Sequence, residues 1–176
     1  MPRTIMMTEQ EIVKGCLAND RAAQRALYDK YKNAMFTLAY RVAGDFGLAE
    51  EILQDAFLKV YKGMHSFRGE STLGAWIKVI LVRTAYTKIK KKVNFDPLEY
   101  VNKEEHIQWS HSLDTEYLEK AILALPEGYR TVFTLVEIEG YAHKEVAKLL
   151  GISEGTSKSQ LFYAKKKLRE NLKFYE

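Results

Sequence analysis

Cysteine, proline and long apolar runs are scarce in this 176-residue chain. The single cysteine, Cys16, excludes an internal disulfide and suits a reducing compartment. The three prolines, at positions 2, 97 and 126, leave a long stretch free to form helices. No apolar run approaches the roughly 18 residues of a transmembrane helix, and residues 1–8 do not resemble a signal peptide. We therefore expect a cytoplasmic protein that does not insert into membranes.

Charge of one sign does not dominate either. The chain has 27 lysines and arginines against 23 aspartates and glutamates, a net charge of +4 and a pI near 9.0. This mild basic excess permits nucleic-acid binding without requiring it. Hydrophobic residues make up 47% of the chain, so global disorder is not expected. The length suits one domain or two small ones.

Apolar residues recur three and four positions apart along most of the chain, which predicts helices. The sequence contains no Asn-Gly or Asp-Gly hairpin signal. The periodicity fades between residues 94 and 115, where Pro97 and five carboxylates accompany a single lysine, Lys103. We predict an all-α protein of two small helical domains, residues 8–93 and 116–174, joined by an acidic linker over 94–115.

The last third of the chain predicts a helix-turn-helix, with an apolar stripe on each helix. Gly151 can adopt the left-handed backbone that stops the first helix, and Ser153 can cap the second. The second helix of such a motif usually enters the DNA major groove, so nucleic acid is the first partner we expect. The stripes consist of Val146, Leu149, Leu150, Ile152, Leu161, Ala164, Leu168 and Leu172.

Segments on both sides of the predicted linker resemble the sigma-70 family of bacterial RNA polymerase sigma factors. Residues 49–57 (AEEILQDAF), 67–72 (FRGEST) and 76–77 resemble the second conserved region. Residues 125–130 (LPEGYR), 145–156 (EVAKLLGISEGT) and 158–159 resemble the fourth. Counterparts of the first and third regions are missing, which is typical of the extracytoplasmic-function (group IV) type. The resemblance implies a sigma region 2 helical bundle followed by a region 4 helix-turn-helix.

Carboxylates spaced four and five residues apart in segment 49–57 can share one exposed helix face. In the family this face docks on the β′ clamp helices of the polymerase. The charge spacing alone also fits an ordinary solvated helix, and a metal site that includes His65 has no motif to support it. The resemblance implies core-polymerase binding by Glu50, Glu51, Gln54, Asp55 and Phe57.

The polar loop from Phe67 to Gly74 separates two predicted helices. In the family it forms a pocket around a base flipped out of the −10 element. The second of these helices ends with four lysines among residues 88–92, more than a helix C-terminus needs, which predicts phosphate contacts. For Trp76 we favour a core position. The implied −10 DNA contacts are Phe67, Arg68, Gly69, Ser71, Thr72, Arg83, Tyr86, Lys90 and Lys91.

Residues near the start of the last helix are expected to reach base edges, and later lysines to reach phosphates. Lys158 can donate to guanine acceptors, and Gln160 can pair with adenine. Arg83 and Thr87 stand where the family commonly has Asn and Asp, a departure that bears on −10 readout. Ser157 and Gln160 stand where it often has Val and Arg, so the −35 base preference cannot be transferred. The implied −35 DNA contacts are Thr156, Lys158, Ser159, Gln160, Tyr163, Lys165 and Lys166.

The resemblance implies a promoter-specificity subunit that catalyses nothing and uses no cofactor, metal or small-molecule substrate. Its partners would be core RNA polymerase, through the β′ clamp and the β flap, promoter DNA and an anti-sigma factor. Two rival functions are a stand-alone regulator and a metal-dependent nuclease or phosphohydrolase; the enzyme would need ligand clusters or a phosphate-binding loop that we do not find. The linker is either a plain tether or threads into the polymerase cleft. Cys16 is expected to be buried.

Overall fold

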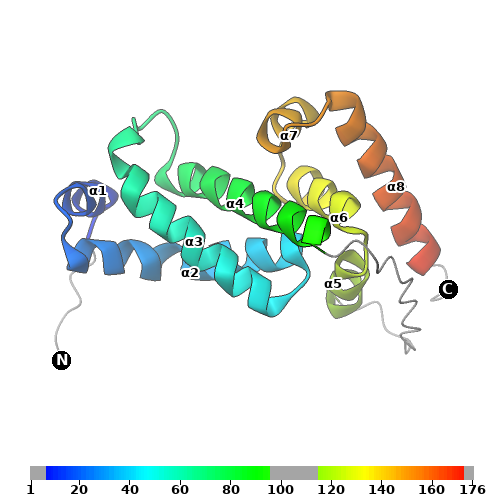
Figure 1. Cartoon of the computed structure of the whole chain (residues 1–176), viewed down its shortest axis with the longest axis horizontal. Coiled ribbons are helices and arrows are strands. Elements are labelled where there is room, and N and C mark those ends of the chain that lie inside the picture. The colour runs from blue at the N-terminus through cyan, green and yellow to red at the C-terminus, as the bar shows by residue number, and fades with distance from the viewer. Residues whose placement is uncertain (1–6, 96–114, 173–176) are drawn as a thin grey trace. The chain divides into compact units, whose positions relative to one another are not determined.

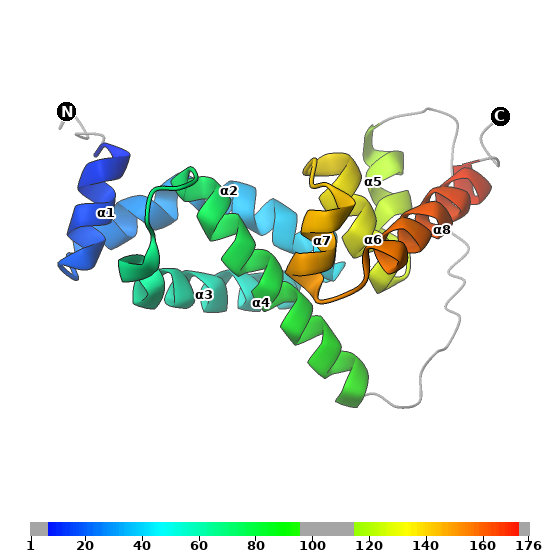
Figure 2. The same ribbon diagram turned by 90° about the horizontal axis from the view of Figure 1, so that it is seen from above.

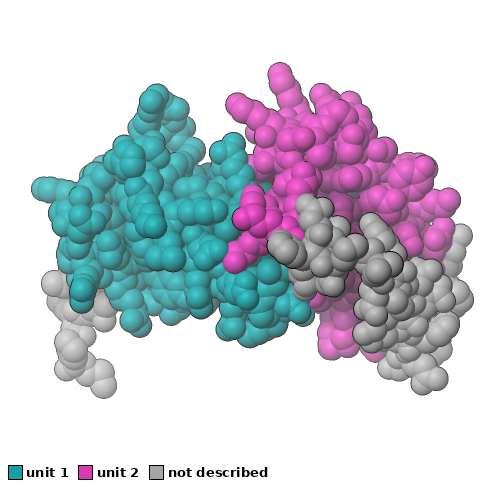
Figure 3. All heavy atoms as spheres, in the orientation of Figure 1, with its two compact units in different colours: residues 1–40, 45–85 teal, residues 41–44, 86–176 magenta. Residues whose placement is uncertain are grey.

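The computed structural model describes residues 7–95 and 115–172, with side chains for residues 7–91 and 116–172. This part of the chain forms eight α-helices, two short helical segments and no strand (Figures 1 and 2), which confirms the predicted all-α fold. The internal contacts group the chain into two compact units, residues 1–40 with 45–85 and residues 41–44 with 86–176 (Figure 3).

The first unit is built from α1, α2, α3 and the first half of α4, with α1 packed on the short segment η1. A capping box starts α1, because Thr8 Oγ1 accepts from the Glu11 amide at 3.3 Å and the Glu11 carboxylate accepts from the Thr8 amide at 2.7 Å. The elements are α1 (Glu9–Leu17), α2 (Arg21–Ala43), α3 (Phe46–Gly63), η1 (Met64–Ser66) and α4 (Leu73–Phe95).

The core of the first unit lies where the apolar stripes of these helices meet. Leu27 of α2, Ile52 and Val60 of α3, and Ile77 of α4 are all fully buried there. Cys16 is buried in α1 as predicted, and burial raises the pKa of its thiol. The periodicity of three and four residues along these helices therefore matches the side that is buried.

The second unit contains α5 (Thr115–Leu123), α6 (Glu127–Phe133), the π-helical segment η2 (Thr134–Ile138), α7 (His143–Leu150) and α8 (Glu154–Leu172). Residues of α5 and of the α5–α6 turn pack with residues of α8 to form its core. That core consists of Ala121, Ile122, Leu125, Ala164 and Leu168, flanked by Tyr129, Phe133 and Leu172.

Helices extend slightly into the predicted linker at both ends. The α4 helix continues to Phe95, two residues past the expected domain end, and α5 begins at Thr115. Residues 96–114 of the predicted linker lie outside the described residues. The two interpretations of this segment, a plain tether or a segment that threads into the polymerase cleft, both fall on these residues.

Candidate polymerase- and DNA-binding surfaces

The acidic face of α3 is presented as the residue spacing predicted. Asp45 starts the helix by accepting from the Leu48 amide at 2.7 Å. Glu50, Glu51 and Gln54 are exposed and Asp55 is half-buried, while the opposite side of the helix is buried in the core. The result is a row of acidic and amide oxygens that a basic partner surface can approach.

Phe57 does not belong to this face, which corrects its assignment as a polymerase contact. Its side chain is only 2% exposed and packs edge-on against Tyr28, with ring centroids 4.9 Å apart. Tyr61 lies on its other side at 6.1 Å. The aromatic ring stabilises the core under the acidic face, and a partner could not reach it without unfolding α3.

A hollow of about 280 Å³ lies beside the acidic face, between α2 and α3. Glu50 and Gln54 contribute to its rim, and Phe36 and Phe46 line it at 5.1 Å from each other. Phe46 is 60% exposed, so one face of this aromatic pair is open to solvent. Neither ring was predicted as part of a site, because Phe46 lies between two glycines, Gly44 and Gly47, and Phe36 follows the buried Met35 on another side of α2.

The loop after η1 forms one wall of an open pocket of about 430 Å³. Phe67, Gly69, Ser71 and Thr72 line this wall, whereas Arg68 is exposed outside it; their contact with −10 DNA stays a prediction. Gly69 has a φ of +72°, a backbone that favours glycine, so the loop can turn sharply here.

Two neighbours of the loop fix its shape. The Phe67 ring lies against half-buried Trp76 with centroids 5.4 Å apart, so Trp76 acts as a support, close to the core position favoured for it. Thr72 Oγ1 accepts from the Ala75 amide at 3.2 Å and so caps α4. The other wall of the pocket is α1, which the sequence had not linked to this loop. We call this feature the α1–loop pocket.

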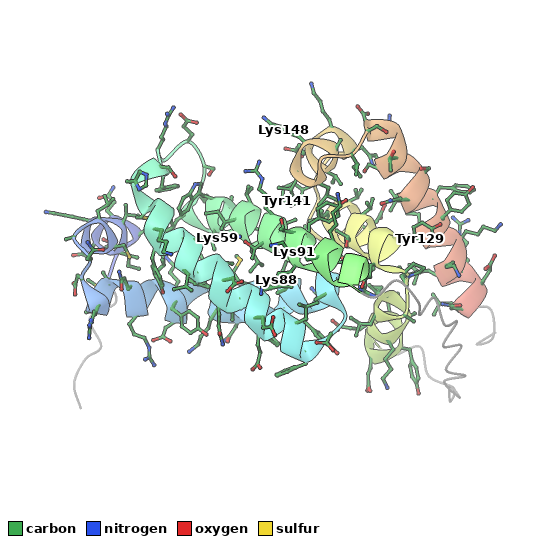
Figure 4. All side chains as sticks on the ribbon, viewed as in Figure 1. Lys59, Lys88, Lys91, Tyr129, Tyr141 and Lys148 are labelled. Carbon is green, nitrogen blue, oxygen red and sulfur yellow. The ribbon has the colours of Figure 1, made fainter. Side chains whose placement is uncertain are left out.

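Helix α4 displays the predicted cations along one side. Arg83, Lys90 and Lys91 are exposed, and Tyr86 is half-buried. Lys90 Nζ lies 4.4 Å from the centroid of the Tyr86 ring, a cation–π contact that holds the ammonium near the helix surface. Figure 4 shows Lys88 and Lys91 along the same helix. Arg83, Tyr86 and Lys90 follow i, i+3, i+7 spacing and therefore share a face.

The helix-turn-helix has the predicted turn. Gly151 ends α7 with φ +67°, and Ser153 Oγ accepts from the Thr156 amide at 2.9 Å to cap α8. Buried Ser157 lies 2.8 Å from His143 Nδ1 through its hydroxyl, which links the start of α7 to α8. The hydrogen bond gives a physical role to Ser157 at a position where the family often has valine.

Several of the predicted −35 contacts already have partners within the second unit, among them Ser159, whose Oγ donates to the Thr156 carbonyl at 3.0 Å. Lys158 pairs with Glu154 at 2.8 Å, and Lys165 pairs with Glu137 at 2.7 Å. These ion pairs are solvent-exposed, so each contributes little stability and can exchange for a phosphate or a base. Thr156 is half-buried, with its hydroxyl 2.8 Å from that of Ser153.

Gln160 is turned toward α6 rather than fully outward. A Cβ added to Gly128 would lie 3.3 Å from Gln160 Nε2, a tight contact, so the amide lies directly over this glycine. Gln160 is half-buried in this position. Contact with adenine would therefore require the side chain to change rotamer, which the spacing argument did not anticipate.

The exposed side of α8 carries one aromatic residue that sequence analysis missed. Phe162 is 64% exposed and stands four residues after Lys158 and three after Ser159, on the same helix face. Next to it, Tyr163 is 47% exposed and stacks on Tyr129 of α6 at 5.9 Å (Tyr129 is labelled in Figure 4). We call this set the α8 surface: Lys158, Ser159, Phe162, Tyr163 and Lys166.

Arg130, the last residue of the LPEGYR motif, links α6 to the end of α5 and to the α5–α6 turn. Its guanidinium is buried and donates from Nη1 to the carbonyl oxygens of Leu123 and Leu125, at 3.0 and 2.8 Å. Leu123 is the last residue of α5 and Leu125 lies in the α5–α6 turn, so one side chain pairs carbonyl oxygens at and just beyond the helix end. Burial lowers the pKa of the guanidinium from its ordinary value, although it remains charged. The arginine of this motif therefore stabilises the fold of the second unit.

Neither a metal-ligand cluster nor a membrane-spanning helix occurs in the part of the chain that the structure describes. No group of three or more His, Cys, Asp or Glu side chains there is arranged to hold a metal ion. None of its helices combines the length and apolar character that crossing a bilayer requires.

The family comparisons match both units. The sigma-70 region 2 model matches residues 27–94, and the sigma-70 region 4 model matches residues 115–168. The RNA polymerase sigma-H factor of Pseudomonas aeruginosa is 29% identical over 180 residues, covering 93% of each chain. The ECF RNA polymerase sigma-E factor of Haemophilus influenzae is 26% identical, covering 94% of this chain and 96% of the relative.

Solved structures agree in fold. The sigma factor RpoE from Bartonella quintana, solved in complex with the anti-sigma factor NepR, is 25% identical with a TM-score of 0.62, covering 85% of this chain and 96% of that one. CnrH, solved with the cytosolic domain of CnrY, has a TM-score of 0.57 at 16% identity, covering 94% of this chain and 97% of that one. The chain therefore belongs to the sigma-70 family as a sigma factor of the extracytoplasmic-function type, a non-enzymatic subunit that gives RNA polymerase its promoter recognition.

Proposed function

We propose that this chain divides promoter recognition between its two helical domains. Residues 8–93 bind core polymerase and the −10 element, and residues 116–174 bind the −35 element across the tether 94–115. The observation that carries this proposal is the α8 surface, where cations, a hydroxyl and exposed aromatic rings share one side of a capped helix. Such a helix fits the major groove and can contact both base edges and phosphates.

Core polymerase binds through the acidic face of α3. The exposed Glu50, Glu51 and Gln54 offer oxygens to a basic surface, with half-buried Asp55 beside them. The hollow lined by Phe36 and Phe46 can accept an apolar side chain from the same partner. This surface suits a helical segment such as the β′ clamp, while the region 4 match suits the β flap as a second contact.

The −10 element binds through the loop 67–72 and α4. A base leaving the duplex costs a few kcal/mol, and stacking in a pocket can offset this cost. Phe67 supplies the aromatic surface in the α1–loop pocket, while Arg83, Lys90 and Lys91 supply cations for the strand's phosphates. The chain acts in the cytoplasm, where its polymerase works.

Gel filtration with bacterial core polymerase tests the polymerase-binding part of this proposal. The wild-type chain should co-elute with the core enzyme, and the double variant Glu50→Lys/Glu51→Lys should lose most of the complex. Glu170→Lys, a charge reversal at an exposed α8 position, is the matched control and should still bind. If the double variant binds as tightly as the wild type, the acidic face of α3 is not the docking surface.

An anti-sigma factor is a further expected partner. Support comes from the Bartonella quintana sigma factor, which was solved with the anti-sigma factor NepR and shares 25% identity with this chain. Affinity purification of the chain from its native cells, followed by mass spectrometry, should recover a protein that competes with core polymerase. Recovery of polymerase subunits alone would count against such a partner.

A further inference from the structure

We propose that α1 is the second wall of the −10 base pocket and that Gln10 and Lys14 read the edge of the unstacked base held there. This inference rests on the proposed role of the loop 67–72. It adds a specificity-determining helix that lies outside the family match, because the region 2 model begins at residue 27. Figures 1 and 2 show α1 next to the loop that precedes α4.

The α1–loop pocket has the size and lining that a nucleobase needs. Its volume of about 430 Å³ falls within the usual range of small-ligand sites, roughly 300 to 1,000 Å³. Val13 and Leu17 of α1 line it opposite Phe67 and Leu73. Leu17 is 52% exposed, so this apolar surface is open to solvent and to a ligand. Two apolar walls suit the two faces of a planar base.

The polar groups of α1 stand where an edge of the base would meet them. Gln10 and Lys14 both line the pocket with exposed side chains, one helical turn apart. Neither side chain has a hydrogen-bond or ion-pair partner among the described residues, although the Lys14 carbonyl accepts from the Ala18 amide at 3.2 Å. The ammonium of Lys14 can only donate, so it favours bases that present ring-nitrogen or carbonyl acceptors, and the amide of Gln10 can donate and accept.

Helix α1 is held firmly enough to act as a reading wall. The Glu9 carboxylate accepts from Tyr31 Oη at 2.7 Å and from Lys30 Nζ at 3.0 Å, which fastens α1 to α2. A Cβ on Gly15 would overlap the methyl group of Ala23, so the backbone of α1 packs directly against a side chain of α2 at this point. Because α1 is ordered before a ligand arrives, contacts to the base carry little ordering cost.

Direct binding of single-stranded DNA to the full-length chain tests the inference without polymerase. The probes are four pentanucleotides that differ only in the central base, and binding is followed by NMR shifts of the α1 and loop amides. One or two probes should bind about fivefold or more tightly than the others, the size expected for a good base-edge contact. Lys14→Ala and Gln10→Ala should abolish this preference. Arg21→Ala, which removes an exposed cation outside the pocket, should leave it intact.

Two results would overturn the inference. One is equal binding of all four probes, or no shift in α1 amides; the other is unchanged preference in Lys14→Ala and Gln10→Ala. If Phe67→Ala still removes binding in the second case, the loop alone forms the pocket and the proposed −10 role survives. If wild-type chain fails to bind core polymerase while the probes still discriminate through α1, the proposed polymerase role fails and the pocket stands.

Discussion

The α8 surface and the α1–loop pocket differ in shape and in how the chain builds them. The α8 surface is convex, comes from one helix, and spaces its side chains at helical intervals. The α1–loop pocket is concave and joins residues about fifty positions apart in the sequence. A convex helix suits the groove of an intact duplex, whereas a concave pocket accepts a base only after it leaves the stack. Under the proposed function, the difference means that one chain reads paired DNA with a convex helix and unpaired DNA with a concave pocket.

The largest expected effect comes from removing the buried side chain of Arg130 in the second unit, which also contains the α8 surface. Arg130→Ala leaves the Leu123 and Leu125 carbonyl oxygens without a buried donor and should lower the free energy of unfolding of the second unit by about 3 kcal/mol. Hydrogen exchange should accelerate in α5–α8 but not in α3. Arg130→Lys should restore little, because an ammonium lacks the planar fork. Unchanged exchange in Arg130→Ala would show that the motif does not support the helix.

The next prediction tests whether side chains of the α8 surface contact base edges, as proposed. Lys158→Ala should weaken binding to a duplex selected from a randomised −35 library by about 5- to 100-fold, the range for loss of a base-edge contact. Phe162→Ala should lose affinity mainly at thymine positions, where its ring can meet the methyl group. Fluorescence anisotropy at fixed salt measures both changes.

Glu154→Gln should change DNA affinity in the opposite direction at the same surface. It frees Lys158 from its ion pair and removes a negative charge near the DNA, so affinity should rise by up to about fivefold. A fall in affinity would instead indicate that Glu154 itself contacts a base.

A smaller effect concerns two buried threonines behind α8. Thr134 Oγ1 is buried without a hydrogen-bond partner among the described residues, whereas Thr131 Oγ1 donates to the Glu127 carbonyl at 2.8 Å. Thr134→Val should be neutral or stabilise by up to about 1 kcal/mol, and Thr131→Val should cost about 1 kcal/mol. Thermal unfolding followed by circular dichroism compares them. Equal losses in the two variants would show that the Thr134 hydroxyl does have a partner.

The smallest effect concerns Glu9 of α1, the helix that forms one wall of the α1–loop pocket. Hydrogen bonds from Tyr31 and Lys30 hold the pKa of the Glu9 carboxyl below its ordinary value of 4.5. A lowered folded-state pKa stabilises α1 at neutral pH, and this stabilisation disappears as pH falls through that pKa. Tyr31→Phe should move the NMR titration midpoint of Glu9 up toward 4.5, while Glu11, held by Thr8, should not change.

The parts of the molecule that depend on local spacing could be predicted from the sequence. The stripes of α2, α3 and α8, the Gly151 turn and the Ser153 cap follow from residues within a few positions of one another. The exposed acidic positions of α3 follow in the same way. Phe57 was misassigned because it belongs to the same motif as the acids, although its own place in the stripe points to the core.

By itself, the sequence determined an all-helical chain, a helix-turn-helix and a family, because helical periodicity and short motifs are local properties. Only the tertiary structure decided that α1 closes the pocket over the loop 67–72, that Gln160 folds over Gly128, and that Arg130 ends α5. Each of these depends on which distant segments pack together. Such packing is selected by the joint burial of many side chains, and no single stretch of sequence encodes it.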